Sequence, residues 1–340
     1  MRLLSGGDEV RICLIGGCGH SGMVLEGIAK SADQVLAGYG GTAVDGLENV
    51  EEVMGRLGLK AARYENYEEM LDSGNPDICV VDNRFDGHGA AAAAALRRGI
   101  ATYCEKPLAL SLGGLKEVER AWKNKGALLW AMQTARYDPW FYTAHKLIKE
   151  GAIGEIRMIN AQKSYRLGRR PDFYKSRATY GGSIPWVGIH AIDMVNFLAG
   201  RPVESVYALH SSAFNRGHGE LEMTGLVTMK LEGELLASVN LDYLRPDAAP
   251  SHGDDRIRAA GTEGVLEVRS CKVYLINGKG EREIPLLTPP TIWEAFIAAC
   301  RGEEGMITAE SSLEATRIAL LARESADKGV PLDLLSYRDN

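Results

Sequence analysis

Three side chains in this sequence have the types and spacing needed to move a proton to or from a hydroxyl group. Lys106 follows a β-like run at 100–103, and His190 and Asp193 come about eighty residues later. An amine at the carboxyl end of a parallel strand points into the crevice where open α/β sheets bind cofactors. A lysine needs a lowered pKa to work near neutral pH, whereas histidine titrates close to it. We therefore expect Lys106 to hydrogen-bond the reacting oxygen and His190 to accept or relay its proton.

Each of these residues also has a structural interpretation. Lys106 could be a solvated loop lysine, His190 a satisfied core histidine and Asp193 a helix–loop contact. Asp193 lies three residues after His190, on roughly the same helix face, so it could instead orient the imidazole or bind a substrate hydroxyl. Trp186 is either a packing residue or a platform that stacks on the C–H groups of a ring substrate.

A glycine-rich loop near the start of the chain predicts dinucleotide binding. Gly17, Gly19 and Gly22 fit the pattern GxGxxG between an expected strand at 10–15 and an expected helix at 21–31. The first glycine permits the tight turn, the second lets the backbone approach a pyrophosphate, and the third lets the helix pack on the strand. The amino terminus of the helix supplies N–H groups for the phosphates. A purely structural glycine turn is the alternative.

The expected second strand, at 35–39, leaves the choice of cofactor open between NAD and NADP. No Asp or Glu stands at its tip, where an acid would bind the ribose hydroxyls, and Asp45 comes several residues later. No arginine follows the strand directly to bind a 2′-phosphate.

The pattern of apolar residues changes near residue 134. Before it, further apolar runs at 78–81, 100–103 and 127–132 alternate with amphipathic stretches, including an expected helix at 88–98 that ends at a glycine. Such alternation indicates a parallel sheet with helices on both faces. We therefore predict an α/β Rossmann domain over residues 1–133.

After residue 134 the strands are expected to pair as hairpins. The runs 226–231 and 235–241 flank a tight Glu232-Gly233 turn, and 273–276 and 281–284 flank a second glycine-containing turn. Helices are expected at 140–149, 186–199, 292–301 and 312–328. Residues 134–340 are thus predicted to form an α+β domain with an open-faced, mostly antiparallel sheet, whose terminal helices could pack back between the domains.

Composition narrows the classes of partner. The 340 residues include 45% apolar and 25% charged residues, which is typical of a globular protein with two domains. A net charge of −6 argues against nucleic acid, and no apolar run approaches the roughly 20 residues that span a bilayer. The six cysteines form no CxxC pair, so we expect small buried thiols in a cytoplasmic protein. His20, His145, His210, His218 and His252 show no metal-binding spacing, and no metal site is predicted.

Several segments together resemble the glucose–fructose oxidoreductase/inositol dehydrogenase (Gfo/Idh/MocA) family over nearly the whole chain. They are the glycine loop, EKPLALS at 105–111, RYDP at 136–139, GAIGEI at 151–156, Gly181-Gly182 ahead of HAID at 190–193, and SADKGVP at 325–331. The resemblance implies NAD or NADP as cofactor and hydride transfer between nicotinamide and a secondary alcohol or ketone of a sugar, cyclitol or sugar acid. It also implies an open sheet face that packs against another subunit, hence a homodimer or homotetramer.

The sequence departs from the family pattern at two places. The family usually has an Asp four residues before the histidine, where this chain has Trp186, and a Thr-Pro-Asn turn where this chain has 83–87, although His88 remains. Lys106 and His190 are the predicted catalytic residues. The predicted cofactor-binding residues are Gly17, Gly19, His20, Ser21, Gly22, Tyr39, Asn83, His88 and Glu105. The predicted substrate-binding residues are Lys106, Arg177, Trp186, Asp193 and His190.

A basic stretch before Gly181 allows two interpretations. Arg166, Arg169, Arg170, Lys175 and Arg177 form either a solvated loop or a site for a charged substrate such as a sugar acid or phosphate. His252, after an expected strand, is a weak candidate for a substrate contact.

Two other functions fit the same residues. A glycosidase or lyase that uses bound NAD transiently would release an aglycone without net NADH. A non-catalytic sugar- or dinucleotide-sensing protein is favoured by the missing Asp, whereas the intact pair of Lys106 and His190 argues against it.

Overall fold

The computed structural model describes residues 4, 9–42 and 44–337. It divides into two compact units: Met1–Gln133 with Pro290–Thr316 (unit 1), and Thr134–Pro289 with Arg317–Asn340 (unit 2). The sequence prediction placed all of 134–340 in one domain, whereas 290–316 belong to unit 1. The reason is that helix α9 (Ile292–Cys300) packs on unit 1. The ring of Trp293 lies so close to Gly27 that a side chain on Gly27 would collide with it. The Nε1–H of Trp293 also donates to Gln34 Oε1 at 2.8 Å.

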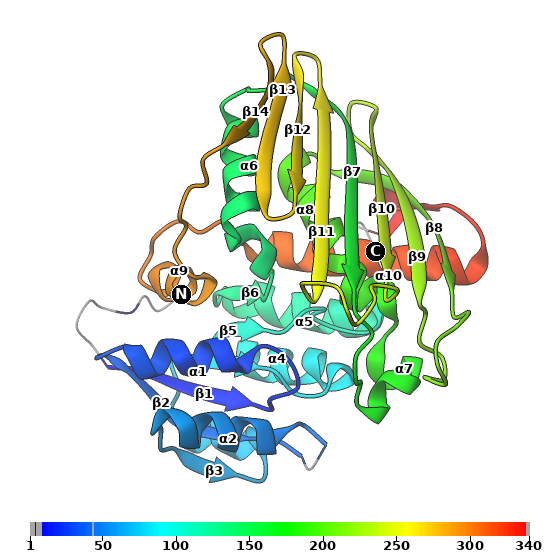
Figure 1. Ribbon diagram of the computed structural model, residues 1–340. Helices are drawn as coiled ribbons and strands as arrows, with labels where there is room; N and C mark the ends of the chain where they lie inside the picture. Colours follow the sequence, from blue (N-terminus) through cyan, green and yellow to red (C-terminus); the bar gives the residue numbers. More distant parts are fainter. Residues whose placement is uncertain (1–3, 5–8, 43, 338–340) are drawn as a thin grey trace. The chain divides into compact units, whose positions relative to one another are not determined.

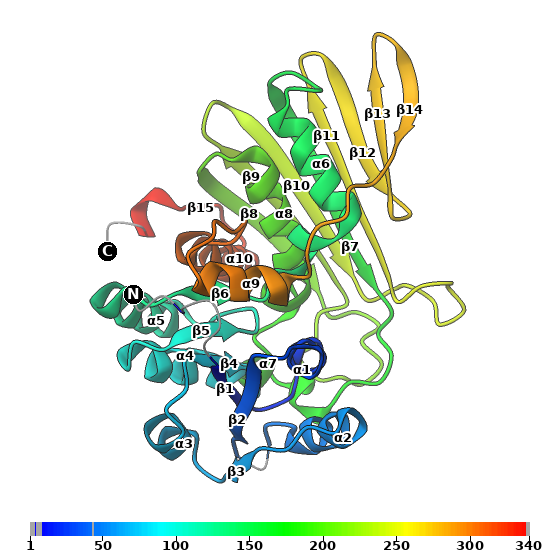
Figure 2. The ribbon, with the colours of Figure 1, turned by 90° about the vertical axis from the view of Figure 1, so that its left-hand side faces the viewer.

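Unit 1 is built on a six-stranded parallel sheet in the order β3-β2-β1-β4-β5-β6. Helices α1 and α2 cover one face and α3, α4 and α5 the other (Figures 1 and 2). This order reverses between β1 and β4, as in Rossmann folds. The elements are β1 (Val10–Ile15), α1 (Ser21–Lys30), β2 (Gln34–Gly40), α2 (Leu47–Leu57), β3 (Ala62–Tyr64), α3 (Tyr67–Ser73), β4 (Ile78–Val81), α4 (His88–Arg97), β5 (Ala101–Cys104), α5 (Leu112–Lys125) and β6 (Leu129–Ala131).

Burial explains why the central elements form where they do. All four side chains of β4 are buried, because a parallel sheet covered on both faces needs continuous apolar strands. The alanines at 91–95 are also buried, and their small side chains let α4 pack closely. The predicted strands β1, β2, β4, β5 and β6 and helices α1 and α4 are confirmed. Elements α2, β3, α3 and α5 were not predicted.

Unit 2 carries a nine-stranded sheet in the order β14-β13-β12-β11-β7-β10-β9-β8-β15. Only β10 and β7 pair in parallel, so the prediction of a mostly antiparallel sheet is confirmed. The strands are β7 (Ile156–Tyr165), β8 (Val203–Ser211), β9 (Thr224–Leu231), β10 (Leu235–Asp242), β11 (Gly253–Gly261), β12 (Gly264–Arg269), β13 (Lys272–Asn277), β14 (Gly280–Ile284) and β15 (Leu332–Asp333).

Two helices, α6 (Pro139–Lys149) and α8 (Ile189–Ala199), pack on one face of this sheet (Figures 1 and 2). Strands β9 and β10 alternate strictly between buried and more exposed residues, as expected for a sheet with one covered face. Exposed apolar side chains on the opposite face include Met158, Leu226 and Leu236, which are 42%, 57% and 51% exposed. The open-faced sheet predicted for this part of the chain is therefore present.

The other predicted elements of unit 2 are also found, with shifted boundaries. The β9–β10 hairpin turns at Glu232-Gly233 as predicted, with Leu231 opposite Leu235. The helix predicted to begin at Trp186 begins earlier, as a π-helical segment Ile184–Gly188 that runs into α8. Helix α10 (Ala309–Lys328) belongs to unit 1 up to Thr316 and to unit 2 from Arg317. The last short helices are α7 (Arg177–Tyr180) and the 3-10 segments Phe85–Gly87, Thr134–Tyr137, Asp172–Lys175 and Leu335–Tyr337.

In residues 4, 9–42 and 44–337, no helix combines the length and the apolar character needed to cross a bilayer. The same residues contain no group of three His, Cys, Asp or Glu side chains arranged to hold a metal ion. All six cysteines are free thiols. Four are buried as predicted, whereas Cys18 is half-buried and Cys271 is exposed, because it lies in the tight turn between β12 and β13.

Candidate functional site

The predicted residues of unit 1 gather at the carboxyl ends of its central strands. In the sheet Ile15 pairs with Val81, and Val81 pairs with Cys104. The segments that follow these three strands therefore leave the sheet at the same edge. They are the glycine loop, Asp82-Asn83 and Glu105-Lys106. This edge, at the reversal of strand order, is where doubly wound sheets bind dinucleotides.

The glycines of the loop have roles that differ from those predicted. Gly16, not Gly17, makes the tight turn, because its φ is +75° and a side chain there would collide with the backbone of Asn83. A side chain on Gly17 would collide with Val50, and one on Gly19 with the carboxylates of Asp82 and Glu105. An added Cβ on Gly22 would meet no described atom within 4 Å. Packing of helix on strand therefore does not explain Gly22.

Asp82 holds the loop to the start of α1, a role that the sequence analysis missed. Its side chain is fully buried, and its carboxylate accepts the backbone N–H groups of His20 at 3.2 Å and Ser21 at 2.9 Å. A carboxylate at this end of a helix satisfies unpaired N–H groups and complements the helix dipole. Burial, reinforced by the charge of Glu105, raises the pKa of Asp82 to about 7. The available signal was an acid directly after an apolar strand.

Glu105 is the centre of a buried charge network. One carboxylate oxygen contacts His20 Nδ1, and the other accepts the N–H of Lys106 at 2.8 Å and lies 3.7 Å from Lys106 Nζ. Burial alone would raise the pKa of Glu105, but the charges of His20 and Lys106 outweigh it and hold the pKa at about 2. Glu105 in turn raises the pKa of His20. Lys106 is 2% exposed, which excludes the alternative of a solvated loop lysine.

His88 supports the loops rather than facing outward. Its ring is fully buried, with Nδ1 2.8 Å from the carbonyl of Pro107 and Nε2 3.0 Å from the carbonyl of Asn83. Burial lowers the pKa of His88. The ring thus joins the turn after Lys106 to the turn after β4. The Oδ1 atom of Asn83 is buried with no hydrogen-bond partner among the described residues.

No acid stands at the carboxyl end of β2, and the polar residues near this end have partners within the fold. The hydroxyl of Tyr39 donates to Glu51 at 3.1 Å. Asp45 accepts the N–H and the hydroxyl of Thr42, both at 2.6 Å, and the N–H of Arg84 at 3.0 Å. Asp45 therefore braces two loops, and both of its carboxylate oxygens have partners within the fold.

In unit 2, His190 lies on α8 and is 7% exposed. It lines a small cavity together with Lys163 of β7 and Asp255 of β11. Lys163 Nζ donates to Asp255 Oδ2 at 2.5 Å, whereas Oδ1 of Asp255 is buried with no hydrogen-bond partner among the described residues. Nearby, burial raises the pKa of Asp138 to about 6, although Lys163 opposes this rise. The sequence analysis did not identify Lys163 or Asp255, which are 92 residues apart.

Asp193 forms a buried ion pair instead of facing a substrate. Its two oxygens accept from Arg136 Nε at 2.9 Å and Nη2 at 2.6 Å, and it is 1% exposed. Burial raises the pKa of Asp193, although Arg136 opposes the shift. The two-pronged contact ties α8 to the segment before α6, so the structural interpretation of Asp193 fits best.

Arg177 and Trp186 also have partners within unit 2. The guanidinium of Arg177 binds Glu222 and both oxygens of Asp327, the latter at 2.8 Å. Trp186 is 8% exposed and packs edge-on against Tyr174, with ring centroids 6.2 Å apart. Trp186 therefore contributes mainly packing, and the carboxylates around Arg177 leave it little capacity for a substrate.

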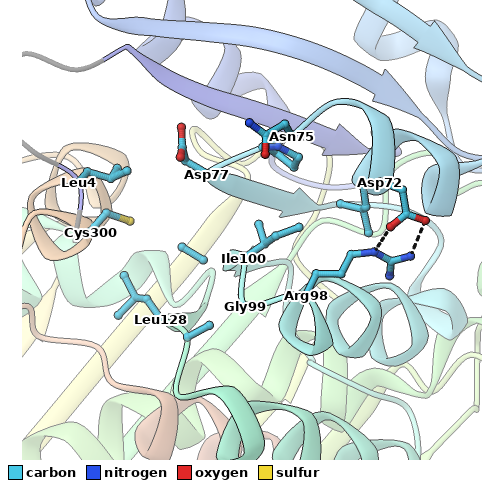
Figure 3. A pocket seen from close by; sticks show the side chains of 13 residues that line it. Leu4, Asp72, Asn75, Asp77, Arg98, Gly99, Ile100, Leu128 and Cys300 are labelled. Carbon is cyan, nitrogen blue, oxygen red and sulfur yellow. Dashed lines mark hydrogen bonds and ion pairs between the residues drawn. The ribbon is translucent and has the colours of Figure 1, made fainter. Parts of the chain in front are cut away.

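A larger cavity, of about 400 Å³, lies at the opposite edge of the unit 1 sheet (Figure 3). Its lining includes Asp77, Ile100 and Leu128 from the segments that precede β4, β5 and β6, together with Leu4 and with Cys300 of α9. Arg98 at its rim is bound by Asp72 at 2.6 and 3.0 Å. Because it adjoins the amino ends of the strands, this cavity is separate from the glycine loop.

The fold and the loop define the class: a protein with a Rossmann dinucleotide-binding unit and a second unit built on an open-faced sheet. Residues 13–133 match the family model described as "Oxidoreductase family, NAD-binding Rossmann fold", and residues 141–267 match "GFO/IDH/MocA C-terminal domain". The chain belongs to the GFO/IDH/MocA family of oxidoreductases, as the sequence motifs predicted.

Individual relatives agree with this assignment. A structure described as that of an oxidoreductase from Thermotoga maritima is 44% identical, covers 95% of this chain and 100% of its own, and superposes with a TM-score of 0.92. A trans-1,2-dihydrobenzene-1,2-diol dehydrogenase of Oryctolagus cuniculus is 24% identical, over 77% of this chain and 76% of its own. An inositol 2-dehydrogenase of Rhizobium meliloti is 25% identical, over 69% of this chain and 70% of its own.

Proposed function

We propose that this oxidoreductase transfers a hydride between nicotinamide and a secondary alcohol or ketone of a sugar, cyclitol or sugar acid. The observation that carries the proposal is Lys106, a buried amine beside the carboxylate of Glu105 at the carboxyl end of β5. The relatives named as dehydrogenases of inositol and of a dihydrobenzenediol support the substrate class. We also propose a cytoplasmic location, on the ground of the six free cysteines.

The glycine loop suits a dinucleotide because it joins the carboxyl end of β1 to the amino terminus of α1, at the edge where doubly wound sheets bind such cofactors. The orphan Oδ1 of Asn83 at the same edge offers a buried acceptor. The bound nicotinamide would supply the hydride acceptor. We assign its binding to the residues predicted from the sequence, with His88 acting through the loops it joins. The direct contacts are Gly17, Gly19, His20, Ser21, Gly22, Tyr39, Asn83 and Glu105.

We assign two proton-handling roles to this chain. Lys106 would hydrogen-bond the reacting oxygen, and Glu105 would keep the amine oriented. His190 would accept or relay the hydroxyl proton, with Asp255 and Lys163 fixing the charge around its ring. Asp193 and Arg177 then support the fold, and Trp186 shapes the surroundings by packing.

Reduction of NAD and NADP, measured in parallel over sugars, cyclitols and sugar acids, tests this function. We expect turnover with at least one substrate and a preference for one dinucleotide. Release of an aglycone without net reduction would establish the glycosidase or lyase instead. Tight dinucleotide binding without turnover on any substrate would establish a sensing protein.

We further propose a homodimer or homotetramer that buries the open face of the unit 2 sheet. The support is two pairs of exposed apolar side chains on neighbouring strands, Met158 opposite Leu236 and Leu209 opposite Leu226, since exposed apolar surface is unfavourable in water. Light scattering should give a multiple of the 36.9 kDa chain mass. Leu226→Glu with Leu236→Glu should yield monomers, and a monomeric unaltered protein would contradict the assembly.

A further inference from the structure

Three cationic side chains at the end of β7 and in the following loop form a cluster in unit 2. Lys163 and Tyr165 belong to β7, and Arg166 and Arg170 follow it. Nη2 of Arg170 donates to the backbone carbonyl of Arg166 at 3.2 Å, so the Arg170 side chain is held against the end of β7. We call Lys163, Arg166 and Arg170 the β7 cation cluster.

Arg166 and Arg170 differ from Arg177 and Arg256 because no carboxylate among the described residues binds them. Among the described residues, Arg177 and Arg256 each bind an aspartate or glutamate, and Lys163 binds Asp255. Arg166 and Arg170 form no ion pair, and the Nε atom of each is buried with no hydrogen-bond partner in that part of the chain. A buried charged donor without an acceptor costs free energy. An acceptor supplied by a ligand would remove this cost.

Aromatic rings hold the cluster in place. The guanidinium of Arg170 lies 5.2 Å from the ring centre of Tyr243 and 5.5 Å from that of Tyr174. Tyr243 is 1% exposed and its hydroxyl contacts that of Tyr180 at 2.8 Å, so this platform is fixed. A preorganised donor loses less conformational entropy when it binds a ligand.

The cluster opens toward solvent at His252, whose backbone carbonyl accepts the N–H of Arg166 at 3.0 Å. The ring of His252 lies 4.9 Å from that of Tyr165, over which Lys163 is placed at 4.9 Å. Burial lowers the pKa of His252, and Arg170, Arg166 and Lys163 lower it further. The electrostatic field of the cluster therefore reaches an exposed side chain. With Lys163 neutralised by Asp255, two positive charges remain for a ligand.

We propose that the β7 cation cluster is a subsite for an anionic group, so that the substrate is a sugar acid or a sugar phosphate and not a neutral polyol. Arginine suits this role because its planar fork binds carboxylate and phosphate oxygens in pairs. This inference rests on the proposed function only for the polyol part of the ligand. Binding of the anionic group does not depend on the hydride-transfer reaction.

Calorimetric titration of the full-length protein with D-gluconate, D-glucose 6-phosphate and D-glucose, without dinucleotide and at fixed ionic strength, tests the subsite. We expect at least one anion to bind about tenfold or more tightly than glucose. Arg170→Gln and Arg166→Gln should each remove most of this preference. Arg169→Gln is the matched control, because Arg169 is the exposed neighbour. It should leave the preference unchanged.

The outcomes separate the possibilities. The anion that loses more affinity in Arg170→Gln tells whether the subsite takes carboxylate or phosphate. Equal binding of glucose and both anions, no binding of either anion, or an equal loss in Arg169→Gln would overturn the subsite. Because no turnover is involved, anion binding that persists in a protein without dehydrogenase activity would contradict the proposed function and leave the subsite standing.

Discussion

Unit 1 and unit 2 each hold a cluster of charges, and the two clusters differ in how far the protein neutralises them itself. In unit 1, Glu105 contacts His20 and Lys106, and Asp82 accepts two N–H groups at the start of α1. In unit 2, Arg166 and Arg170 have no carboxylate among the described residues. The charges of the first cluster are paired within the fold, whereas the second contains arginines with no carboxylate partner among the described residues.

This difference shows how stability and recognition can be separated. Where the fold supplies every counter-charge, removing one partner leaves a buried charge uncompensated and destabilises the protein. Where the fold supplies none, removing the charge changes binding more than folding. Unit 2 contains both cases, because its Arg136–Asp193 pair is complete and Arg170 is not.

The sharpest contrast is between two arginines of unit 2. Arg136→Met would leave the Asp193 carboxylate buried without its partner and should lower the free energy of unfolding by about 3–5 kcal/mol. Arg170→Met should change it by less than about 1 kcal/mol, since no carboxylate depends on it. Urea unfolding of both variants at neutral pH measures the difference. If both variants lost the same free energy of unfolding, the distinction between the paired Arg136 and the unpaired Arg170 would be wrong. If Arg136→Met lost turnover but kept its stability, Asp193 would again be a substrate-binding residue.

The contribution of the Glu105 charge network to the free energy of unfolding should depend on pH. The folded pKa of Glu105 is about 2, below the ordinary value of 4.5, so its ionisation stabilises the folded state above about pH 4.5. That contribution, on the order of 3 kcal/mol, is lost as the pH falls from 4.5 toward 2. The stability gap between the unaltered protein and Glu105→Gln should therefore be widest above pH 5 and close in acid. A gap that is independent of pH would contradict the network.

The smallest expected effect concerns two glycines of the loop. Gly17→Ala introduces a methyl group against Val50 and should destabilise unit 1 by about 1–3 kcal/mol. Gly22→Ala has free space and replaces a helical glycine, so it should stabilise by roughly 0.5–1 kcal/mol. Thermal unfolding compares them. If Gly22→Ala abolishes dinucleotide binding while stability is unchanged, close approach of the cofactor explains this glycine.

The sequence predicted unit 1 better than unit 2 for a physical reason. Its site residues follow strands directly, and strands of a parallel sheet end at one edge, so Lys106 and the glycine loop could be placed from local patterns. The Lys163–Asp255 and Arg136–Asp193 contacts join residues 92 and 57 positions apart. No local periodicity encodes such pairs, because they depend on how β7, β11 and α8 pack.

Within unit 1, the sequence analysis assigned the wrong role to Gly17 and overlooked Asp82. The pattern GxGxxG suggested that Gly17 makes the turn, but the backbone of Asn83 requires Gly16 there. Asp82 was overlooked because its role depends on N–H groups 61 and 62 residues away. The basic stretch was left between two interpretations, since only the folded structure separates the paired Arg177 from the unpaired Arg170.

The most direct test of the account is Lys106→Met, assayed for dinucleotide binding by fluorescence titration and for nicotinamide reduction with the best substrate of the panel. The account predicts a loss of turnover of about 10²–10⁴-fold, with dinucleotide affinity within about threefold of the unaltered protein. Loss of both activities, or of neither, would contradict the role assigned to Lys106.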